Sequence, residues 1–161
     1  MGFMKAVMAG ALVIGCSAAL LAIERTTLPV FDVSDARGAT VSSRTLVRAG
    51  TWLLVYVRPD CPPCDAILRS VDKDRDPALP SRIVVMVALS DSRLLPSIAE
   101  RFPALAGAAW YADSSAGAQA MRVTDVPAVL GVRDATIEWS VGGVLTDAAD
   151  ITTIMAAWVK R

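Results

Sequence analysis

Continuous apolar runs alternate along this chain with segments in which apolar residues recur at helical spacing. The runs Thr51–Val57 and Arg82–Leu89 are rich in strand-favouring residues, so they predict two strands that are buried on both faces. The segment after the first run keeps its helical spacing up to about Lys73 and predicts a helix. Turn residues at Asp35–Gly38 and at Arg133–Asp134 predict two hairpins.

The rest of the pattern completes an alternation of strands and helices that ends in a hairpin and a helix. Ser90 or Asp91 and Asp113 precede two of the predicted helices and are candidate caps. We predict helices over 90–101, 114–121 and 146–159, and strands over 108–112, 126–130 and 136–141. This order predicts the α/β class, with a mixed central sheet that is covered on both faces.

The first 27 residues follow a different pattern. Ala6–Ile23 is a run of 18 uncharged residues between Lys5 and Glu24, just long enough to cross a bilayer as a helix. It has no polar face, which a buried helix of a cytosolic domain would normally carry. We therefore predict a signal or membrane-anchor segment over 1–27 and an exported domain over 28–161.

Three fates of this segment are compatible with its pattern. The favoured fate is an uncleaved anchor in the inner membrane. The alternatives are cleavage after a small residue and lipidation of Cys16, because Val13–Cys16 resembles a lipobox. All three place the domain in the periplasm or another extracytoplasmic space. Thiols there tend to be paired or chemically employed, and the exported domain has two, Cys61 and Cys64.

Composition narrows the function further. The chain has 161 residues, which suits a single exported domain. It has 16 lysines and arginines and 16 aspartates and glutamates, so its net charge gives no electrostatic basis for binding nucleic acid. Histidine is absent, which excludes Ser-His-Asp and Cys-His catalytic groups and removes the commonest transition-metal ligand.

The two exported cysteines lie where the first buried strand passes into a helix. Residues i and i+3 are neighbours on a helix, so the two sulfurs can form a small disulfide ring. Pro62 and Pro63 fit the first turn, where backbone N–H groups lack intrahelical partners. We expect the helix N-terminus to lower the pKa of the Cys61 thiol and make it the attacking group. Cys64, one turn further, is expected to be more buried and to resolve the mixed disulfide.

Two structural interpretations of the cysteine pair stay open. A permanent disulfide would close a loop of only four residues and would therefore stabilise the fold weakly. Zinc normally takes four protein ligands in a structural site, and this domain offers two cysteines and no histidine, so a zinc site would have to be shared across a dimer. We predict no metal and no cofactor beyond the redox-active pair.

Three stretches of the chain resemble the thioredoxin superfamily over about residues 28–160. The first is Phe31–Val41, followed by Leu46 and Gly50; the second is the strand that runs into Cys61–Cys64; the third is Val123–Pro127. Within the superfamily the chain is most similar to membrane-anchored, extracytoplasmic TlpA-like thiol-disulfide oxidoreductases. The resemblance implies a thioredoxin-like fold with a mixed sheet flanked by helices, an N-terminal β-hairpin extension and an N-terminal hydrophobic helix.

The resemblance also implies a substrate site opposite the cysteines. In the family, a proline in the cis conformation faces the cysteine pair, and here that residue is Pro127. The preceding backbone, here that of Val126, binds the substrate chain as an added strand. Without the family, Pro127 would be an ordinary loop proline, because only about one X-Pro bond in twenty is cis in folded proteins.

The chain departs from the family at two positions. Asp60 replaces the usual tryptophan before the first cysteine, and we expect it to cap the helix. The segment Arg58–Cys64 is also similar to MauD-like proteins that take part in methylamine dehydrogenase maturation, which favours a dedicated client. Val55 occupies the place of the buried acid of thioredoxins, so water or Asp65 would have to move the proton of the resolving cysteine.

The family implies a reductase of exported client proteins. We predict a monomer, because no amphipathic stripe for oligomerisation stands out in the sequence. The electrons of this reductase would come from a transmembrane thiol reductant of the DsbD or CcdA type. The alternatives are a disulfide oxidant or isomerase for a dedicated client and a non-catalytic interaction domain with a passive disulfide. A peroxiredoxin is disfavoured, because Arg58 stands where that branch has threonine or serine. A Sco-type copper carrier would need a histidine.

Overall fold

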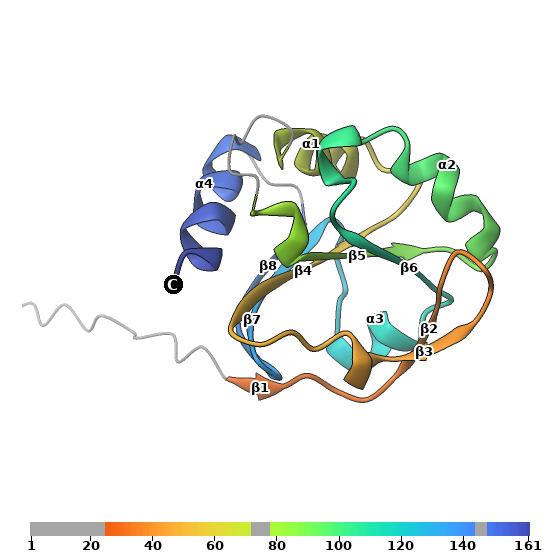
Figure 1. Ribbon diagram of the computed structural model, residues 1–161, viewed down its shortest axis with the longest axis horizontal. Coiled ribbons are helices and arrows are strands. Elements are labelled where there is room, and N and C mark those ends of the chain that lie inside the picture. The colour runs from red at the N-terminus through yellow and green to blue at the C-terminus, as the bar shows by residue number, and fades with distance from the viewer. Residues whose placement is uncertain (1–24, 72–77, 144–147) are drawn as a thin grey trace, which may run out of the picture.

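The computed structural model describes residues 25–71, 78–143 and 148–161. They form one eight-stranded sheet in the order β1-β8-β7-β4-β5-β6-β2-β3 (Figure 1). The strands are β1 (Thr26–Thr27), β2 (Asp32–Ser34), β3 (Thr40–Ser42), β4 (Thr51–Val57), β5 (Ile83–Ala88), β6 (Ala109–Asp113), β7 (Ala128–Arg133) and β8 (Thr136–Gly142). The helices are α1 (Pro62–Val71), α2 (Leu95–Ala99), α3 (Ala116–Met121) and α4 (Ala148–Val159).

The centre of the sheet is a parallel trio, β4-β5-β6, flanked by strands that run the other way. β7 pairs antiparallel with β4, and β8 pairs antiparallel with β7. On the far side, β2 pairs antiparallel with β6 and with β3. All seven residues of β4 are buried, because β4 is central and both of its faces are covered. The sequence prediction of two buried strands and of a mixed, covered α/β sheet is confirmed.

Helices cover the two faces of the sheet unequally. The α1, α2 and α4 helices lie on one side, here called the α1 face, and the short α3 lies on the other, here called the α3 face (Figure 1). On the α3 face the core is completed by the chain before β4. Gly117 brings α3 close to the sheet, because an added Cβ there would lie 2.6 Å from the Met86 side chain. The α3-face core contains Leu28, Phe31, Val33, Leu46, Trp52, Leu54, Tyr56, Val84, Met86, Ala128, Leu130 and Val132.

One predicted helix is built differently from the expectation. The segment predicted as a single helix over 90–101 begins as a 3₁₀ turn, Ser92–Leu94, and continues as the five-residue α2. Pro96 explains the change, because it has no N–H to donate to the carbonyl of Ser92 in an α-helix. Asp91 does cap the turn, since its side chain accepts a hydrogen bond from the backbone N–H of Arg93 at 3.1 Å.

Other boundaries shift by a few residues. β7 begins at Ala128, two residues after the predicted start, because Val126 and Pro127 belong to a loop. Lys73, the predicted last residue of the helix after β4, and Thr146, the predicted first residue of the final helix, lie outside the described residues. Thr26 and Thr27, which the pattern assigns to the N-terminal segment, pair with β8 and are part of the sheet.

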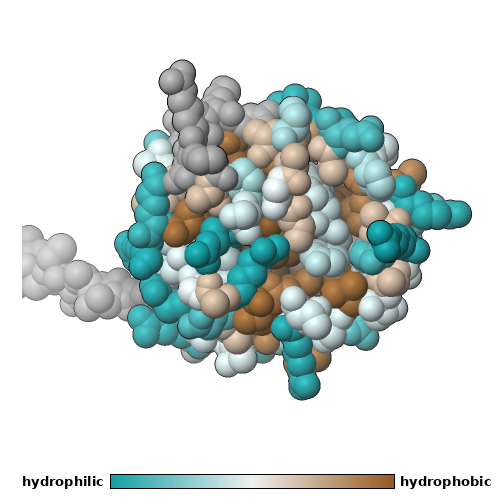
Figure 2. Space-filling model, viewed as in Figure 1, coloured by the Kyte–Doolittle hydropathy of each residue, from teal (hydrophilic) through white to brown (hydrophobic). Residues whose placement is uncertain are grey.

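The membrane prediction falls mostly outside the described part of the chain. Ala6–Ile23 lies in the range 1–24, which is not described. In the ranges that are described, no helix is long and apolar enough to cross a membrane. The exposed large apolar side chains there are Val30, Leu94 and Ile154. Figure 2 shows apolar residues in small groups among polar ones on the viewed face, which is ordinary for a protein surface.

Candidate active site

The cysteine pair lies at the end of the central strand. β4 ends at Val57, and after three intervening residues Cys61 stands immediately before α1. Cys61 and Cys64 are joined by a disulfide whose Cα atoms are 5.2 Å apart. Cys61 is 6% exposed and Cys64 is 1% exposed, and both belong to the core of the α1 face. The strand-to-helix placement predicted from the sequence is therefore confirmed.

In the first turn of α1, a backbone N–H group donates a hydrogen bond to the sulfur of Cys61. Pro62 and Pro63 have no N–H, so Cys64 carries the first backbone donor of the helix. That N–H donates to the Sγ of Cys61 at 3.2 Å. Cys61 thus occupies the N-cap position and its sulfur acts as the capping atom.

The expectation that Asp60 caps α1 is wrong. Its carboxylate is exposed and makes no hydrogen bond with the described residues. The physical reason is position, because Asp60 lies one residue before the N-cap and the two prolines leave no nearby N–H for it. The charge of Asp60 instead adjoins the surface around Cys61.

An open hollow gives access to Cys61. It has a volume of about 560 Å³. Its lining consists of Pro59, Asp60, Cys61, Pro62, Asp65, Ala66 and Arg69. Cys64 is not in this lining and lies among apolar side chains of the α1 face. The hollow would admit a partner's sulfur to Cys61, whereas it does not reach Cys64.

The loop before β7 lies at the same end of the sheet. Val126–Pro127 is a cis peptide bond, as the resemblance to the thioredoxin superfamily implied. Ala128, the next residue, pairs with Tyr56 near the end of β4, which leads to Cys61. Pro127 is buried, and its carbonyl accepts a hydrogen bond from Gly143 at 3.0 Å. Val126 is half-buried and packs against the cores of both faces.

Over the described ranges, no buried carboxylate lies beside Cys64. Val55 is buried in the α1-face core with Cys64. Asp65, the sequence candidate for this role, forms an ion pair with Arg101. Its side chain is 28% exposed and lines the hollow on the Cys61 side. The Asp65 side chain therefore shares this hollow with Cys61, whereas Cys64 is not in its lining.

A buried polar pair on the α3 face was missed by the sequence analysis. The Asp113 carboxylate is 1% exposed and accepts a hydrogen bond from the hydroxyl of Tyr56 at 2.8 Å. It also accepts backbone N–H bonds from Ser115, Gly117 and Ala118 at the start of α3. The sequence indicated Asp113 as a cap, but no local signal marks a partner 57 positions away. Burial, followed by the bond to Asp113, raises the pKa of Tyr56 far above its usual value.

The site is built from cysteine and backbone chemistry. Within the described ranges, no cluster of three or more histidine, cysteine, aspartate or glutamate side chains could hold a metal ion. The atoms that meet at the end of β4 are two sulfurs, the N–H groups of a helix start and a cis-proline loop. Such a set can exchange disulfides or hold one permanently.

Solved structures with the same fold include proteins described as disulfide oxidoreductases and as a thioredoxin. A secreted Mycobacterium tuberculosis disulfide oxidoreductase homologous to E. coli DsbE superposes with a TM-score of 0.62 at 17% identity, over 79% of this chain and 95% of that one. A putative thiol:disulfide interchange protein DsbE from Chlorobium tepidum gives 0.58 at 15%, over 83% and 95%. The exposed lipoprotein thioredoxin of Streptococcus pneumoniae gives 0.56 at 12%, over 80% and 99%.

These likenesses establish a thioredoxin-like fold for the chain, as its sequence predicted. No family model matches the sequence, and a search of curated proteins gave no match.

Proposed function

We propose that this protein is an extracytoplasmic thiol-disulfide oxidoreductase that reduces disulfides of exported client proteins. The observation that carries the proposal is the Cys61–Cys64 disulfide at the start of α1, next to a cis-proline loop. The thioredoxin-like fold shared with proteins described as disulfide oxidoreductases supports it.

The proposed reaction begins with both cysteines reduced. The Cys61 thiolate attacks one sulfur of a client disulfide, forms a mixed disulfide and releases the other client sulfur as a thiolate. Cys64 then gives its proton to water and attacks the Cys61 sulfur, which releases the second client thiolate. The client gains two electrons, its two thiolates take up protons, and the protein is left with its own disulfide.

The hydrogen bond at the N-cap supports this assignment of roles. The N–H of Cys64 points at the Sγ of Cys61, so it can stabilise negative charge on that sulfur. The hollow reaches Cys61 and not Cys64, which supports attack at Cys61 and resolution by Cys64. Pro62 and Pro63 keep other backbone donors away from this turn.

We assign client binding to the loop beside the cysteines. The backbone of Val126, held by the cis bond to Pro127, would pair with an extended client segment as an added strand. Asp60 would contact the client residues next to its disulfide, because it is exposed and adjoins the hollow.

The location and partners of the protein form part of the proposal. We infer that the apolar segment in 1–27 exports the domain and keeps it at the inner membrane, so that a transmembrane thiol reductant of the DsbD or CcdA type can re-reduce Cys61 and Cys64. The similar Mycobacterium tuberculosis protein is described as secreted and the Streptococcus pneumoniae protein as an exposed lipoprotein, which supports an extracytoplasmic location. The sheet begins at Thr26, so the exported domain includes Thr26 and Thr27.

A reduction potential tests the direction of electron flow. The full-length chain in mild detergent is equilibrated with glutathione or dithiothreitol buffers, and the free thiols of Cys61 and Cys64 are counted by alkylation. A potential near or below about −270 mV, thioredoxin's value, supports a reductase. A potential near about −120 mV would instead support the alternative, an oxidant for a dedicated client.

Trapping variants separate the enzyme from a passive disulfide. Cys64→Ser should accumulate mixed disulfides between Cys61 and client proteins, because the resolving thiol is gone. Cys61→Ser is the matched control and should trap far less, since Cys64 is buried. Equal trapping by both variants, or no exchange by the wild type, would leave only a structural disulfide.

A further inference from the structure

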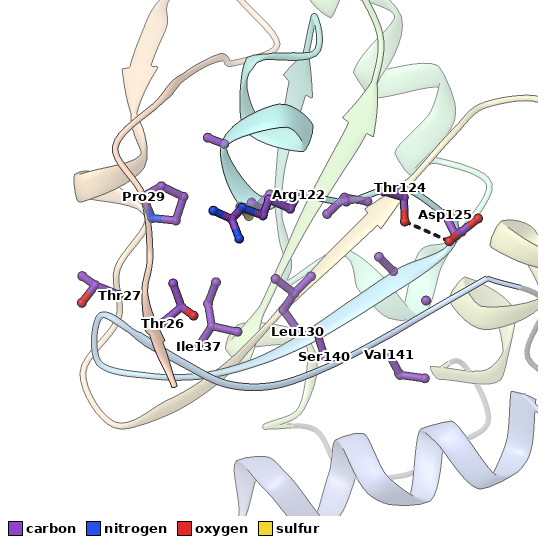
Figure 3. Close-up of a pocket in the computed structure, with 15 residues that line it drawn as sticks. Thr26, Thr27, Pro29, Arg122, Thr124, Asp125, Leu130, Ile137, Ser140 and Val141 are labelled. Atoms are coloured by element: carbon purple, nitrogen blue, oxygen red, sulfur yellow. Dashed lines mark hydrogen bonds between the residues drawn. The ribbon is translucent and has the colours of Figure 1, made fainter. Parts of the chain in front are cut away.

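A groove runs along the α3 face from the cis-proline loop to the edge of the sheet (Figure 3). Its volume is about 560 Å³. Thr124 and Asp125, from the loop that ends at Pro127, line one end, and Thr26, Thr27 and Pro29 line the other. The groove is thus continuous with the loop to which we assign client binding.

A β-bulge in β8 shapes the floor of the groove. Ile137 pairs with Val132 and Trp139 pairs with Gly131, so Glu138 is an extra residue in β8. The bulge puts Ile137 and Ser140 on the same face, and both line the groove. β1 covers β8 only at Thr136 and Ile137, so the strand edge beyond the bulge has no neighbouring strand in the described chain.

Arg122 forms the cationic wall of the groove. It follows α3 and adopts a left-handed backbone conformation with φ of 57°, and its backbone N–H bonds to carbonyls of the last turn. Val123 also donates back to Ala118 at 2.9 Å, which completes a helix end where glycine is the usual residue. Arginine at this position carries a conformational cost that glycine would avoid.

The side chain of Arg122 has no partner among the described residues. It is exposed and makes no ion pair, hydrogen bond or ring contact there. Figure 3 shows its guanidinium extending over the groove toward Pro29, with Leu130 and Ile137 below it. Asp125 is at the other end and accepts a hydrogen bond from Thr124 at 2.9 Å. An unpaired cation over a partly apolar floor is complementary to a carboxylate.

We propose that this groove is a second client subsite, in which Arg122 selects client segments that carry an aspartate or glutamate near the disulfide. The proposal rests on the proposed exchange activity of Cys61 and Cys64. The client segment would be extended, leave the Val126 backbone and lie over β7 and β8. From Gly142 to Ile137 the floor spans about 15 Å at roughly 3.3 Å per residue, so the carboxylate would lie about three to six residues from the client cysteine.

The experiment measures exchange with a set of short peptides. Each peptide has one cysteine, joined by a disulfide to a chromophoric aromatic thiol that is released when Cys61 attacks the peptide sulfur. A single glutamate is moved from one to seven residues away on either side, and each peptide has a glutamine counterpart. The reduced full-length chain in mild detergent is used, and the result is the glutamate-to-glutamine rate ratio at each position.

The expected result is a position-dependent preference that belongs to Arg122. The wild type should favour glutamate about fivefold at one or two positions, as an exposed ion pair allows, and 0.5 M salt should reduce the preference. Arg122→Gly should abolish it and Arg122→Glu should invert it. Arg122→Lys should restore part of it. Arg122→Gly should also unfold at the same or a higher temperature, which separates lost selectivity from lost folding.

Arg37→Glu is the matched charge control. Arg37 is exposed in the turn between β2 and β3, at the opposite edge of the sheet from β8. The Arg37→Glu variant changes the net charge by the same amount as Arg122→Glu, and it should keep the wild-type glutamate-to-glutamine rate ratios.

Three outcomes would count against the inference. Ratios of one at every position in the wild type overturn it while leaving the exchange activity intact. A preference that survives in Arg122→Gly, or is lost equally in Arg37→Glu, overturns it as well. Failure of the wild type to react with any peptide and with a small aromatic disulfide overturns the proposed function together with this inference.

Discussion

The two faces of the sheet bury different polar groups, because the α1 face holds two hydrogen-bonded hydroxyls, those of Ser70 and Thr152, whereas the α3 face holds a carboxylate and a phenol. Asp113 is the one charged side chain that is fully buried among the described residues, and its four hydrogen-bond donors satisfy it. Val55, the position at which the resemblance to thioredoxins implies an acid, lies in the hydrophobic core of the α1 face. The difference separates the two proposed tasks, because the face without a buried charge holds the cysteine pair and the face with the buried Asp113 carboxylate holds the groove proposed for the client.

The largest effect on stability is expected when an acid is placed in the core of the α1 face. Val55→Asp should lower the free energy of unfolding by about 4 kcal/mol at pH 7, because a buried carboxylate there would find no donor. Burial raises the pKa of such a group above its value in the unfolded chain, so the loss should grow as pH rises from about 4. Urea unfolding at several pH values measures this.

Val55→Asn is the control for that experiment. It also buries a polar group but cannot ionise, so its cost should not change between pH 4 and pH 8. A pH-independent cost for Val55→Asp would mean that solvent or an unseen donor reaches this position.

Removing the charge of Asp113 from the α3 face should lower the free energy of unfolding by a smaller amount. Asp113→Asn keeps the shape of the side chain but replaces one acceptor oxygen with a donor that faces an N–H or the Tyr56 hydroxyl. We expect a loss of about 2 kcal/mol in the free energy of unfolding. Hydrogen exchange at the amides of Gly117 and Ala118 should speed up, since these bond to Asp113 directly. Unchanged exchange there would contradict the role of Asp113 in holding α3.

A smaller effect is expected from the other member of the pair. Tyr56→Phe removes one hydroxyl and leaves Asp113 with three backbone donors, so it should cost about 1 kcal/mol at pH 7. In the wild type the pKa of Tyr56 is raised by burial and by Asp113. Its contribution to stability is therefore complete below about pH 10, the usual tyrosine pKa, and is lost above it. In Tyr56→Phe the free energy of unfolding should therefore fall less above pH 10 than in the wild type. If it falls just as steeply with pH in both proteins, Tyr56 is not the source of the loss.

The smallest effect concerns the ion pair beside Cys61. Asp65 and Arg101 are partly exposed, so Asp65→Asn should change the free energy of unfolding by less than about 1 kcal/mol. It removes a negative charge next to the attacking sulfur, so alkylation of reduced Cys61 at fixed pH should rise by up to about threefold. Glu100→Gln, an exposed change next to Arg101, is the control and should alter neither quantity. A slower alkylation of Asp65→Asn would show that the carboxylate assists Cys61.

The sequence by itself determined the central part of this protein. The apolar run of β4, the two prolines and the spacing of Cys61 and Cys64 are local features, so they already predicted a cysteine pair able to form a disulfide at a strand-to-helix junction. The cis bond before Pro127 followed from resemblance to a family rather than from local chemistry.

Only the tertiary structure decided the rest, because it depends on residues that are far apart in the chain. Sheet order brings Tyr56 to Asp113, and a bulge in β8 turns Ser140 toward the groove. The sequence predicted Asp60 as the N-cap of α1, but in the structure the N-cap is Cys61. The identity of the cap depends on which residue begins the helix, and the hydrophobic pattern locates that residue only to within one or two positions. Arg122 is one more surface arginine in the sequence, and it becomes a candidate specificity residue only because the end of α3 holds it over a groove beside the cis-proline loop.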